Sequence, residues 1–278
     1  MRRSRTLVSL IALSFVLSAC GSSSSDSGSD SNAQGQEGVL APYDASKAGG
    51  TLTLVAKGAA GTLDPHINYT LQFWQLYQAT YDGLLAFRKV DGPKSFETVP
   101  DLAEALPELS DGGKTLTFTL RKGIKFSDGR DVTVNDVKAS FERIFKVLSP
   151  TAGGFYNGIV GADACLAKPA TCKLDQGVIV DPATNKIEIK LTAPDATINY
   201  KLALPHASIL PADAPSKDAG TTPIPTTGPY MFASYDPNKE LKMVRNPNFK
   251  EWNREAQPAG YPDEIVYQFG LTAEAQVN

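Results

Sequence analysis

An alternating segment followed at once by a helical one, between residues 115 and 148, most constrains what this chain can fold into. Its first part alternates threonines with apolar residues, which is typical of a strand with one buried face. The apolar positions are Leu116, Phe118 and Leu120. We expect the chain to reverse at Lys122-Gly123 and to continue as a second strand through Phe126, before Asp128-Gly129 turns it again.

A helix is expected directly after these turns. Thr133 can cap its first turn, and Asp136 stands three residues later, as in a capping box. The apolar residues that follow repeat at helical spacing and predict one buried stripe. They are Val134, Val137, Phe141, Ile144, Phe145 and Leu148. The segment therefore predicts a hairpin with an amphipathic helix beside it.

Strand-like and helix-like segments alternate irregularly over the rest of the chain from Gly50. Four further segments read as strands: residues 51–55, 185–194, 240–246 and 263–270. Residues 70–80 predict an amphipathic helix with Leu71, Trp74 and Tyr77 on one face and Phe73 alongside. Because a regular strand–helix–strand rhythm is missing, we expect an α/β fold of the mixed α+β kind.

The charge balance argues against a nucleic-acid-binding protein. The chain has 27 basic and 30 acidic residues, a formal net charge of −3. Binders of nucleic acids need a concentrated basic face, which this balance does not indicate.

The first residues have the pattern of an export signal. Three arginines precede the apolar run Leu7–Leu17, which is too short to span a bilayer but suits the core of a secretory signal. The run ends in Leu17-Ser18-Ala19-Cys20, which resembles the lipobox of bacterial lipoproteins; the alternative is a plain signal peptide. The resemblance implies cleavage after residue 19 and lipidation of Cys20, with two or more acyl chains for stable anchoring.

A polar tract follows the lipobox. Residues 21–38 are rich in Ser, Gly and Asp and contain no apolar side chains to bury. We expect residues 20–49 to form a lipidated cysteine and a flexible tether, which holds the folded part off the membrane.

Two cysteines remain after Cys20. Cys165 and Cys172 lie close together in a loop-like segment, and an even pair in an exported protein indicates a disulfide. The alternative is a two-cysteine metal site, but no histidine lies nearby. We therefore expect a disulfide and no metal site.

Four ordered segments together resemble a known family. The longest is "LTFTLRKGIKFSDGRDVTVNDVKASFERI"; the others are "GGTLTLVAKGAAGTLDPH", "YDGLL", and "TTGPYMFASY" followed by "ELKMVRNPNF". They resemble the family 5 extracellular solute-binding proteins of ABC importers, the oligopeptide, dipeptide and nickel type. The resemblance covers nearly all of residues 50–270.

The resemblance implies a fold of two lobes that close on a ligand. Residues 50–270 match the first lobe of this periplasmic-binding-protein-like fold, in an incomplete form. Residues 271–278 match the start of the second lobe. We therefore expect a truncated receptor in which the second lobe is largely missing.

The implied function is that of a substrate-binding component, lipid-anchored on the outer face of the cell membrane. It would capture peptides or a related small solute and deliver it to the permease subunits. The family also includes receptors for nickel complexes, haem and oligosaccharides, so the ligand stays open. The alternative is a surface lipoprotein that acts as a sensor or chaperone-like module without transport.

The resemblance also suggests ligand contacts. The run Ala59-Ala60-Gly61 follows the first strand, where relatives line the cleft and small residues permit close approach. Phe73 and Trp74 could form an aromatic wall, or could pack in the core. Phe155 and Tyr156 are expected on a glycine-flanked loop that borders the pocket in relatives.

An enzymatic function is not indicated. His66 and His206 are the only histidines, and neither stands in a nucleophile or zinc motif. We expect His66 to be structural, and no cofactor. The basic residues Arg121, Lys122 and Lys125 are expected to be solvated scaffold residues rather than ligand contacts.

Overall fold

The structure is a computed structural model that describes residues 38–271. The predicted signal peptide, Cys20, most of the tether and residues 272–278 lie outside the described residues. Within residues 38–271, no helix combines the length and apolar character that crossing a membrane would need.

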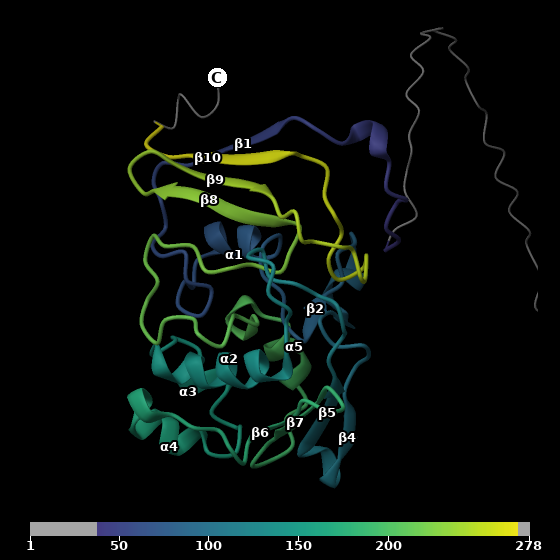
Figure 1. Ribbon diagram of the computed structural model, residues 1–278, viewed down its shortest axis with the longest axis vertical. Helices are drawn as coiled ribbons and strands as arrows, with labels where there is room; N and C mark the ends of the chain where they lie inside the picture. Colours follow the sequence, from purple (N-terminus) through teal and green to yellow (C-terminus); the bar gives the residue numbers. More distant parts are fainter. Residues whose placement is uncertain (1–37, 272–278) are drawn as a thin grey trace, which may run out of the picture. The chain divides into compact units, whose positions relative to one another are not determined.

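Two antiparallel-rich sheets lie at opposite ends of the described part (Figure 1). The first has the order β1-β10-β9-β8, and β1 is parallel to β10. The second has the order β4-β5-β7-β6 and is antiparallel throughout. The strands of the first sheet are β1 (Thr51–Val55), β8 (Tyr230–Asp236), β9 (Glu240–Arg245) and β10 (Glu264–Gln268); those of the second are β4 (Glu108–Ser110), β5 (Thr115–Thr119), β6 (Val178–Asp181) and β7 (Lys186–Lys190).

The remaining elements are two further strands, five α-helices and several 3-10 turns. The strands β2 (Leu85–Phe87) and β3 (Thr98–Pro100) form a small antiparallel pair. The α-helices are α1 (Leu71–Tyr77), α2 (Val134–Lys146), α3 (Ala152–Phe155), α4 (Ala162–Ala167) and α5 (Ile198–Leu202). Single 3-10 turns are Ala45–Lys47, Pro93–Phe96, Asp111–Gly113, Pro169–Thr171 and Pro205–Ala207.

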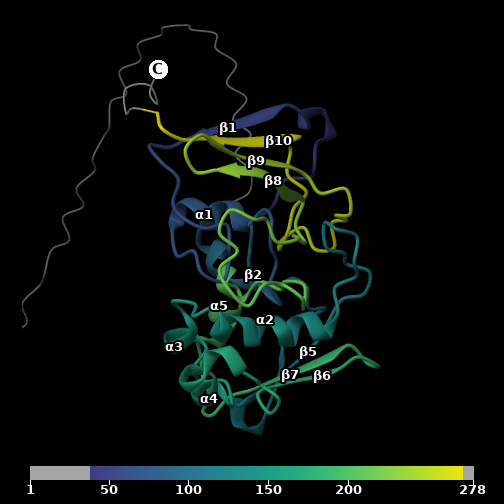
Figure 2. The same ribbon diagram turned by 60° about the vertical axis from the view of Figure 1, so that its left-hand side comes forward.

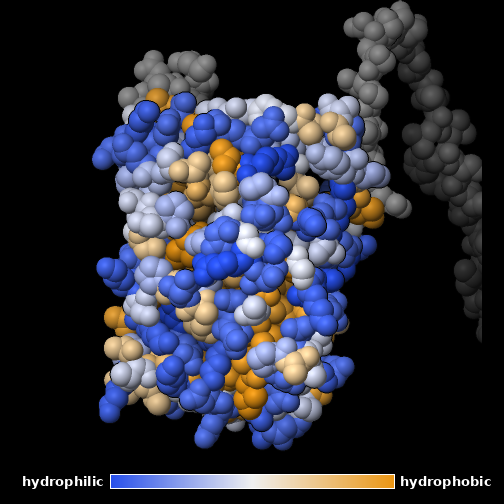
Figure 3. All heavy atoms as spheres, in the orientation of Figure 1, coloured by the Kyte–Doolittle hydropathy of each residue, from blue (hydrophilic) through white to orange (hydrophobic). Residues whose placement is uncertain are grey.

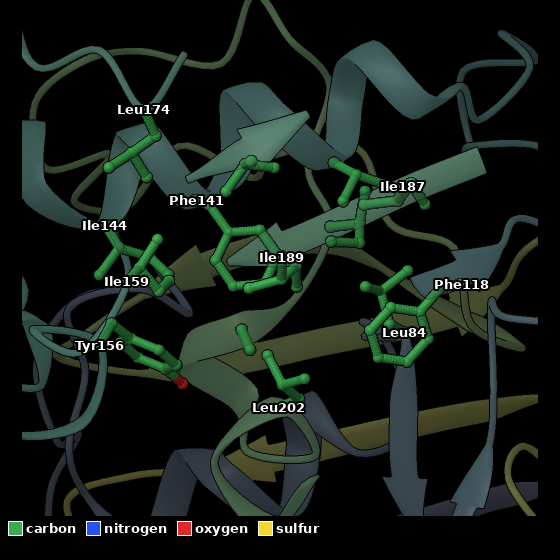
Figure 4. Close-up of a cluster of buried hydrophobic side chains, with 14 of the residues drawn as sticks. Leu84, Phe118, Phe141, Ile144, Tyr156, Ile159, Leu174, Ile187, Ile189 and Leu202 are labelled. Carbon is green, nitrogen blue, oxygen red and sulfur yellow. The ribbon is translucent and has the colours of Figure 1, made fainter. Parts of the chain in front are cut away.

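Each sheet has its own apolar core. Helix α1 lies under the first sheet, and α2 lies beside the second, as both views show (Figures 1 and 2). The second core is the larger and contains Phe118 and Ile187, which are paired across β5 and β7, together with Phe141 and Ile144 of α2 (Figure 4). On the viewed face, apolar side chains reach the surface mainly in the half that contains this core (Figure 3).

The predicted hairpin is wrong in its partners. Strand β5 pairs with β4 and β7, not with the segment after Lys122-Gly123. That segment instead turns back on itself: Phe126 N donates to Arg130 O at 2.8 Å, and Val132 N donates to Ile124 O at 2.9 Å. Both edges of β5 are occupied by other strands, so the hairpin forms locally around Asp128-Gly129.

The two predicted helices differ in accuracy. Helix α2 has the predicted capping box, with Thr133 N donating to Asp136 Oδ2 at 2.8 Å, and the stripe is buried up to Phe145. Leu148 lies beyond the end of the helix and is 71% exposed, which corrects its predicted place in the stripe. In α1, Tyr77 of the predicted face is buried together with Phe73, but Leu71 is 83% exposed and does not belong to the inner face.

A disulfide joins Cys165 of α4 to Cys172. Both cysteines are buried in the core of the second sheet, where α4 and the following turn pack against α2. The bridge therefore links two neighbouring segments rather than distant parts of the chain.

Candidate functional site

The candidate site is the loop of residues 57–62 that follows β1, called here the β1 loop. Ala59 and Ala60 are half-buried and pack against the core of the first sheet, while Gly61 is exposed. Gly61 has a φ of 97°, a left-handed conformation that a side chain would strain. Apart from the exposed Lys57, the loop thus presents mainly backbone at its surface.

Asn68 fixes the shape of this loop through two hydrogen bonds from its side-chain amide. Its Nδ2 donates to Ala60 O at 2.8 Å and to Thr62 O at 2.7 Å. The backbone carbonyl of Asn68 accepts a hydrogen bond from Trp74 Nε1 at 3.0 Å. Asn68 therefore connects Trp74 to the β1 loop, and these predicted residues come together through a residue that the sequence did not single out.

The end of the loop is tied to residues 215–220. Thr62 Oγ1 donates to Asp218 Oδ1 at 2.5 Å, and Leu63 N donates to Gly220 O at 2.7 Å. Asp64 is fully buried and accepts from Ala219 N at 3.1 Å. The β1 loop is consequently held at both of its sides by long-range hydrogen bonds.

Arg143 of α2 neutralises Asp64. Burial by itself raises the pKa of Asp64, but the hydrogen bonds and charge of Arg143 outweigh it and hold the pKa below its usual range. Arg143 Nε also donates to Pro215 O at 2.7 Å. A single guanidinium therefore organises both segments that support the β1 loop.

The other predicted aromatic residues lie in the cores. Phe73 is fully buried and meets Tyr235 at a ring-centroid distance of 5.7 Å. Tyr156 is fully buried and donates from its hydroxyl to Lys201 O at 2.8 Å. The expectation of a loop is wrong for Phe155, which ends the short helix α3; its ring is partly buried and packs against the core of the second sheet, which contains Tyr156.

One exposed aromatic residue was missed. Tyr69 is 54% exposed and lies against Trp74 and His206, with ring centroids 5.0 and 5.2 Å away. His206 itself is buried, and neither of its ring nitrogens has a hydrogen-bond partner among residues 38–271. Burial lowers the pKa of His206 to about 4, so it is neutral near pH 7.

A buried acidic pair lies at a cavity that Trp74 and Tyr77 of α1 also line. Asp82 and Asp101 line a cavity of about 160 Å³ together with Lys89. Asp82 accepts from Thr227 Oγ1 and Gln257 Nε2, and Asp101 accepts from Trp252 Nε1. No local pattern in the sequence points to this pair.

Both carboxyl groups have raised pKa values. Burial, and then the charge of Asp82, raises the pKa of Asp101 well above its usual range; burial also raises the pKa of Asp82. Lys89 faces both, and burial lowers its pKa. Within the described residues, no group of three or more His, Cys, Asp and Glu side chains could hold a metal ion.

The basic residues near Gly123 serve the scaffold. Arg121 Nε donates to Asp101 O at 2.9 Å, and Lys125 Nζ lies 2.6 Å from Asp131 Oδ1. Lys122 is exposed. These contacts hold local backbone, as expected of scaffold residues, and the three cations do not converge on the β1 loop.

Comparisons with known proteins agree with this architecture. The middle region of the bacterial extracellular solute-binding proteins, family 5, matches residues 97–278. A probable D,D-dipeptide-binding periplasmic protein of Escherichia coli (strain K12) is 32% identical over 196 residues, which cover 68% of this chain and 34% of that protein. The dipeptide-binding protein of the same strain is 34% identical over 199 residues, covering 65% and 34%.

A solved structure is similar over most of the chain. It is titled clavulanic acid biosynthesis oligopeptide binding protein 2, with a TM-score of 0.66 and 29% identity. The similarity covers 81% of this chain and 41% of that one. The chain spans about a third of the length of the curated relatives above. The predicted mixed α/β lobe is thereby confirmed.

Proposed function

Since this chain belongs to family 5 of the bacterial extracellular solute-binding proteins, we propose that it is the substrate-binding component of an ABC importer. It captures peptides or a related small solute outside the cytoplasm and delivers the solute to permease subunits. The observation that carries this proposal is the family match over residues 97–278. The names of two relatives, which describe dipeptide binding, favour a peptide ligand.

The β1 loop is the proposed ligand contact of this lobe. Its backbone is exposed at Gly61, and Trp74 lies beside it through Asn68. Extended peptides are often bound by backbone hydrogen bonds to exposed chain segments. Ala59, Ala60, Gly61 and Trp74 are retained as ligand contacts, whereas the buried rings of Phe73 and Tyr156 are assigned to the cores.

The lobe binds without chemistry. The family consists of solute-binding proteins, and a closing motion of two lobes around the ligand accounts for capture. We propose residues 50–270 as the first lobe and residues 271–278 as the start of the second. No covalent step is required of any residue.

Residues 1–49 are proposed to place the lobe at the membrane. Residues 1–19 act as the export signal, Cys20 carries the lipid, and residues 20–49 form the tether. Labelled palmitate should enter the full chain when it is expressed in bacteria, and the Cys20→Ser variant should stay unlabelled. Equal labelling of both would contradict the anchor.

Peptide binding is tested through tryptophan fluorescence. Trp252 lies at the acidic pair, so the Trp252→Phe variant leaves Trp74 as the reporter next to the β1 loop. Trialanine should change the emission saturably in the millimolar range, because one lobe offers part of a cleft. Lactose serves as the control. The absence of any saturable change with di- and tripeptides would overturn the peptide proposal.

A further inference from the structure

The hydrogen-bond capacity of the β1 loop is one-sided. Five of its carbonyl groups accept hydrogen bonds from the protein itself. Gly270 N donates to Lys57 O at 3.1 Å, Gln72 Nε2 to Gly58 O at 3.1 Å, Asn68 Nδ2 to Ala60 O and Thr62 O, and Tyr235 Oη to Gly61 O at 2.5 Å. Among the loop carbonyls, only that of Ala59 lacks a donor within the described part of the chain.

The backbone N–H groups of the same loop, unlike its carbonyl groups, lack hydrogen-bond partners within residues 38–271. None of the N–H groups of residues 57–62 has a hydrogen-bond partner among residues 38–271, although the next amide, Leu63 N, donates to Gly220 O. Each backbone N–H is an obligatory donor that must find an acceptor. The loop therefore has free donors and almost no free acceptors.

Asn68 occupies two of the five bonded carbonyl groups, those of Ala60 and Thr62. It is 4% exposed, and both Nδ2 hydrogens are used on loop carbonyls. Its Oδ1 accepts from Thr70 N at 3.0 Å and from Thr70 Oγ1 at 2.7 Å. An asparagine amide offers two donors and one acceptor oxygen, and all are occupied here. The side chain is thus locked, with its donors turned towards the loop.

We infer that Asn68 is a positioning residue that contributes to making the β1 loop mainly a hydrogen-bond-donor face, so that the loop recognises acceptor oxygens of the ligand. A terminal carboxylate or successive peptide carbonyls have this chemistry, whereas an ammonium group does not. The inference rests on the proposed function for the place of the ligand. It adds the polarity of recognition and the residue that sets it.

The positioning role is tested first without ligand, by ¹⁵N NMR of the chain lacking residues 1–19. The Asn68 side-chain amide should exchange slowly with solvent, while the backbone amides of residues 58–62 exchange rapidly. In Asn68→Asp, the carboxylate is repelled by the two carbonyl oxygens that the amide contacts. The chemical shifts of the loop amides should therefore change. Slow exchange of the loop amides in the unaltered protein would overturn the inference.

Recognition of acceptors is tested next, with two probes. Trialanine presents carbonyls and a carboxylate, and 1,4-diaminobutane presents donors alone. Trialanine should shift loop amide protons downfield, the diamine should not, and Asn68→Asp should weaken trialanine binding about tenfold. Shifts elsewhere without shifts in the loop overturn this inference but keep peptide binding. No shifts anywhere overturn peptide binding, and the ligand-free exchange then decides the role of Asn68.

Asn246→Asp is the matched control. Asn246 is also buried, donates through Nδ2 to a distant carbonyl, that of Gly228, at 2.9 Å, and accepts through Oδ1 from Asn248 N. Its replacement should reduce stability as Asn68→Asp does, but leave the loop signals and trialanine binding unchanged. Equal effects of the two variants on trialanine binding would reduce Asn68 to a purely structural residue and contradict the inference.

Discussion

Arg143 grips Asp64 with two parallel hydrogen bonds inside the protein: Nη1 to Oδ1 at 2.9 Å and Nη2 to Oδ2 at 2.5 Å. The side chains are 4% and 0% exposed. The pair joins α2 to the segment that follows the β1 loop, two regions far apart in the sequence. Its geometry is the bidentate one in which arginine binds carboxylate most strongly.

Arg143→Met should be strongly destabilising. The change leaves Asp64 buried without its cation and frees the carbonyls of Pro215 and Lys217. Removal of one partner of a buried pair costs about 3–5 kcal/mol in the free energy of unfolding. Urea denaturation followed by circular dichroism measures it.

Arg130→Met is the control for this prediction. Arg130 pairs with Asp128 and Asp213, but its side chain is 49% exposed. Exposed pairs contribute about 0–1 kcal/mol, so this variant should be close to the unaltered protein. Comparable losses in both variants would contradict the role given to the Asp64 pair.

The Asp101→Asn variant should lose less stability than the unaltered protein as the pH rises. The pKa of Asp101 is raised in the folded state, so the folded protein holds its proton more tightly than the unfolded chain does. Stability is then fully present below the unfolded pKa and declines as pH rises towards the folded pKa. An asparagine imitates the protonated acid, can still accept from Trp252 Nε1, and does not ionise.

The measurement is the unfolding free energy between pH 2 and pH 9, with Asp128→Asn as the control of opposite sign. Burial raises the pKa of Asp128, but the hydrogen bonds from Arg130 outweigh burial and hold this pKa below its usual range. The stability that ionised Asp128 contributes is therefore lost on acidification. The slope of the unfolding free energy against pH should flatten on the alkaline side for Asp101→Asn and on the acidic side for Asp128→Asn. An unchanged alkaline slope in Asp101→Asn would contradict the raised pKa of Asp101.

The local elements were more predictable than their partners. The capping box and the stripe from Val134 to Phe145 depend on neighbouring residues, so the sequence indicated α2 correctly. The alternation of Leu116 and Phe118 showed which face of β5 is buried but not that Ile187, much later in the chain, lies opposite. Strand partners depend on tertiary packing, which local periodicity does not encode.

The site was predictable to a similar extent. The resemblance pointed to Ala59, Ala60 and Gly61, yet the residue that shapes their loop, Asn68, has no motif of its own. In α1, aromatic and aliphatic residues occupy both sides of the helix, so spacing alone could not choose between Leu71 and Phe73. The core of the first sheet made that choice by burying Phe73 against Tyr235.

His206→Phe should make the protein more resistant to acid. The folded pKa of His206 is about 4, below the ordinary value of 6.5, because burial disfavours the charged ring. The unfolded chain therefore binds more protons in this window, and stability falls as pH drops from 6.5 through 4, by up to about 3 kcal/mol. A phenylalanine keeps the contacts with Tyr69 and Trp74 and does not titrate.

Thermal unfolding at pH 7 and pH 4 tests this prediction. The difference in melting temperature between the two conditions should shrink in His206→Phe. His66, whose pKa burial lowers to about 3, remains in the variant, so part of the acid sensitivity persists. An undiminished difference would show that His206 does not titrate as proposed.

Loss of the disulfide should reduce stability moderately. The bridge closes the short loop from Cys165 to Cys172, and closing so short a loop stabilises by about 2–3 kcal/mol. The double variant Cys165→Ser, Cys172→Ser should lose this amount in urea denaturation. Dithiothreitol should bring the unaltered protein to nearly the same stability and leave the variant unaffected; sensitivity of the variant would point to another cause.

Gly228→Ala should be destabilising because the backbone at Gly228 packs directly against the backbone of Ala79 and Thr80. A Cβ atom at Gly228 would lie 2.7 Å from the carbonyl oxygen of Ala79 and 3.0 Å from the carbonyl carbon of Thr80. Both segments are held by hydrogen bonds, since Gly228 N donates to Thr80 O at 2.9 Å and Tyr230 N donates to Ala79 O at 3.1 Å. Neither can move aside easily, and overpacking of this kind costs about 1–3 kcal/mol.

Gly158→Ala is the matched control, because a Cβ atom there meets nothing within 4 Å. That change should leave stability unaltered or raise it slightly by restricting the unfolded chain. Urea denaturation of both variants separates the two cases. If Gly228→Ala were as stable as Gly158→Ala, the contact between the 227–230 segment and the end of α1 would be looser than the structure has it. The glycine would then owe its place to something other than close approach.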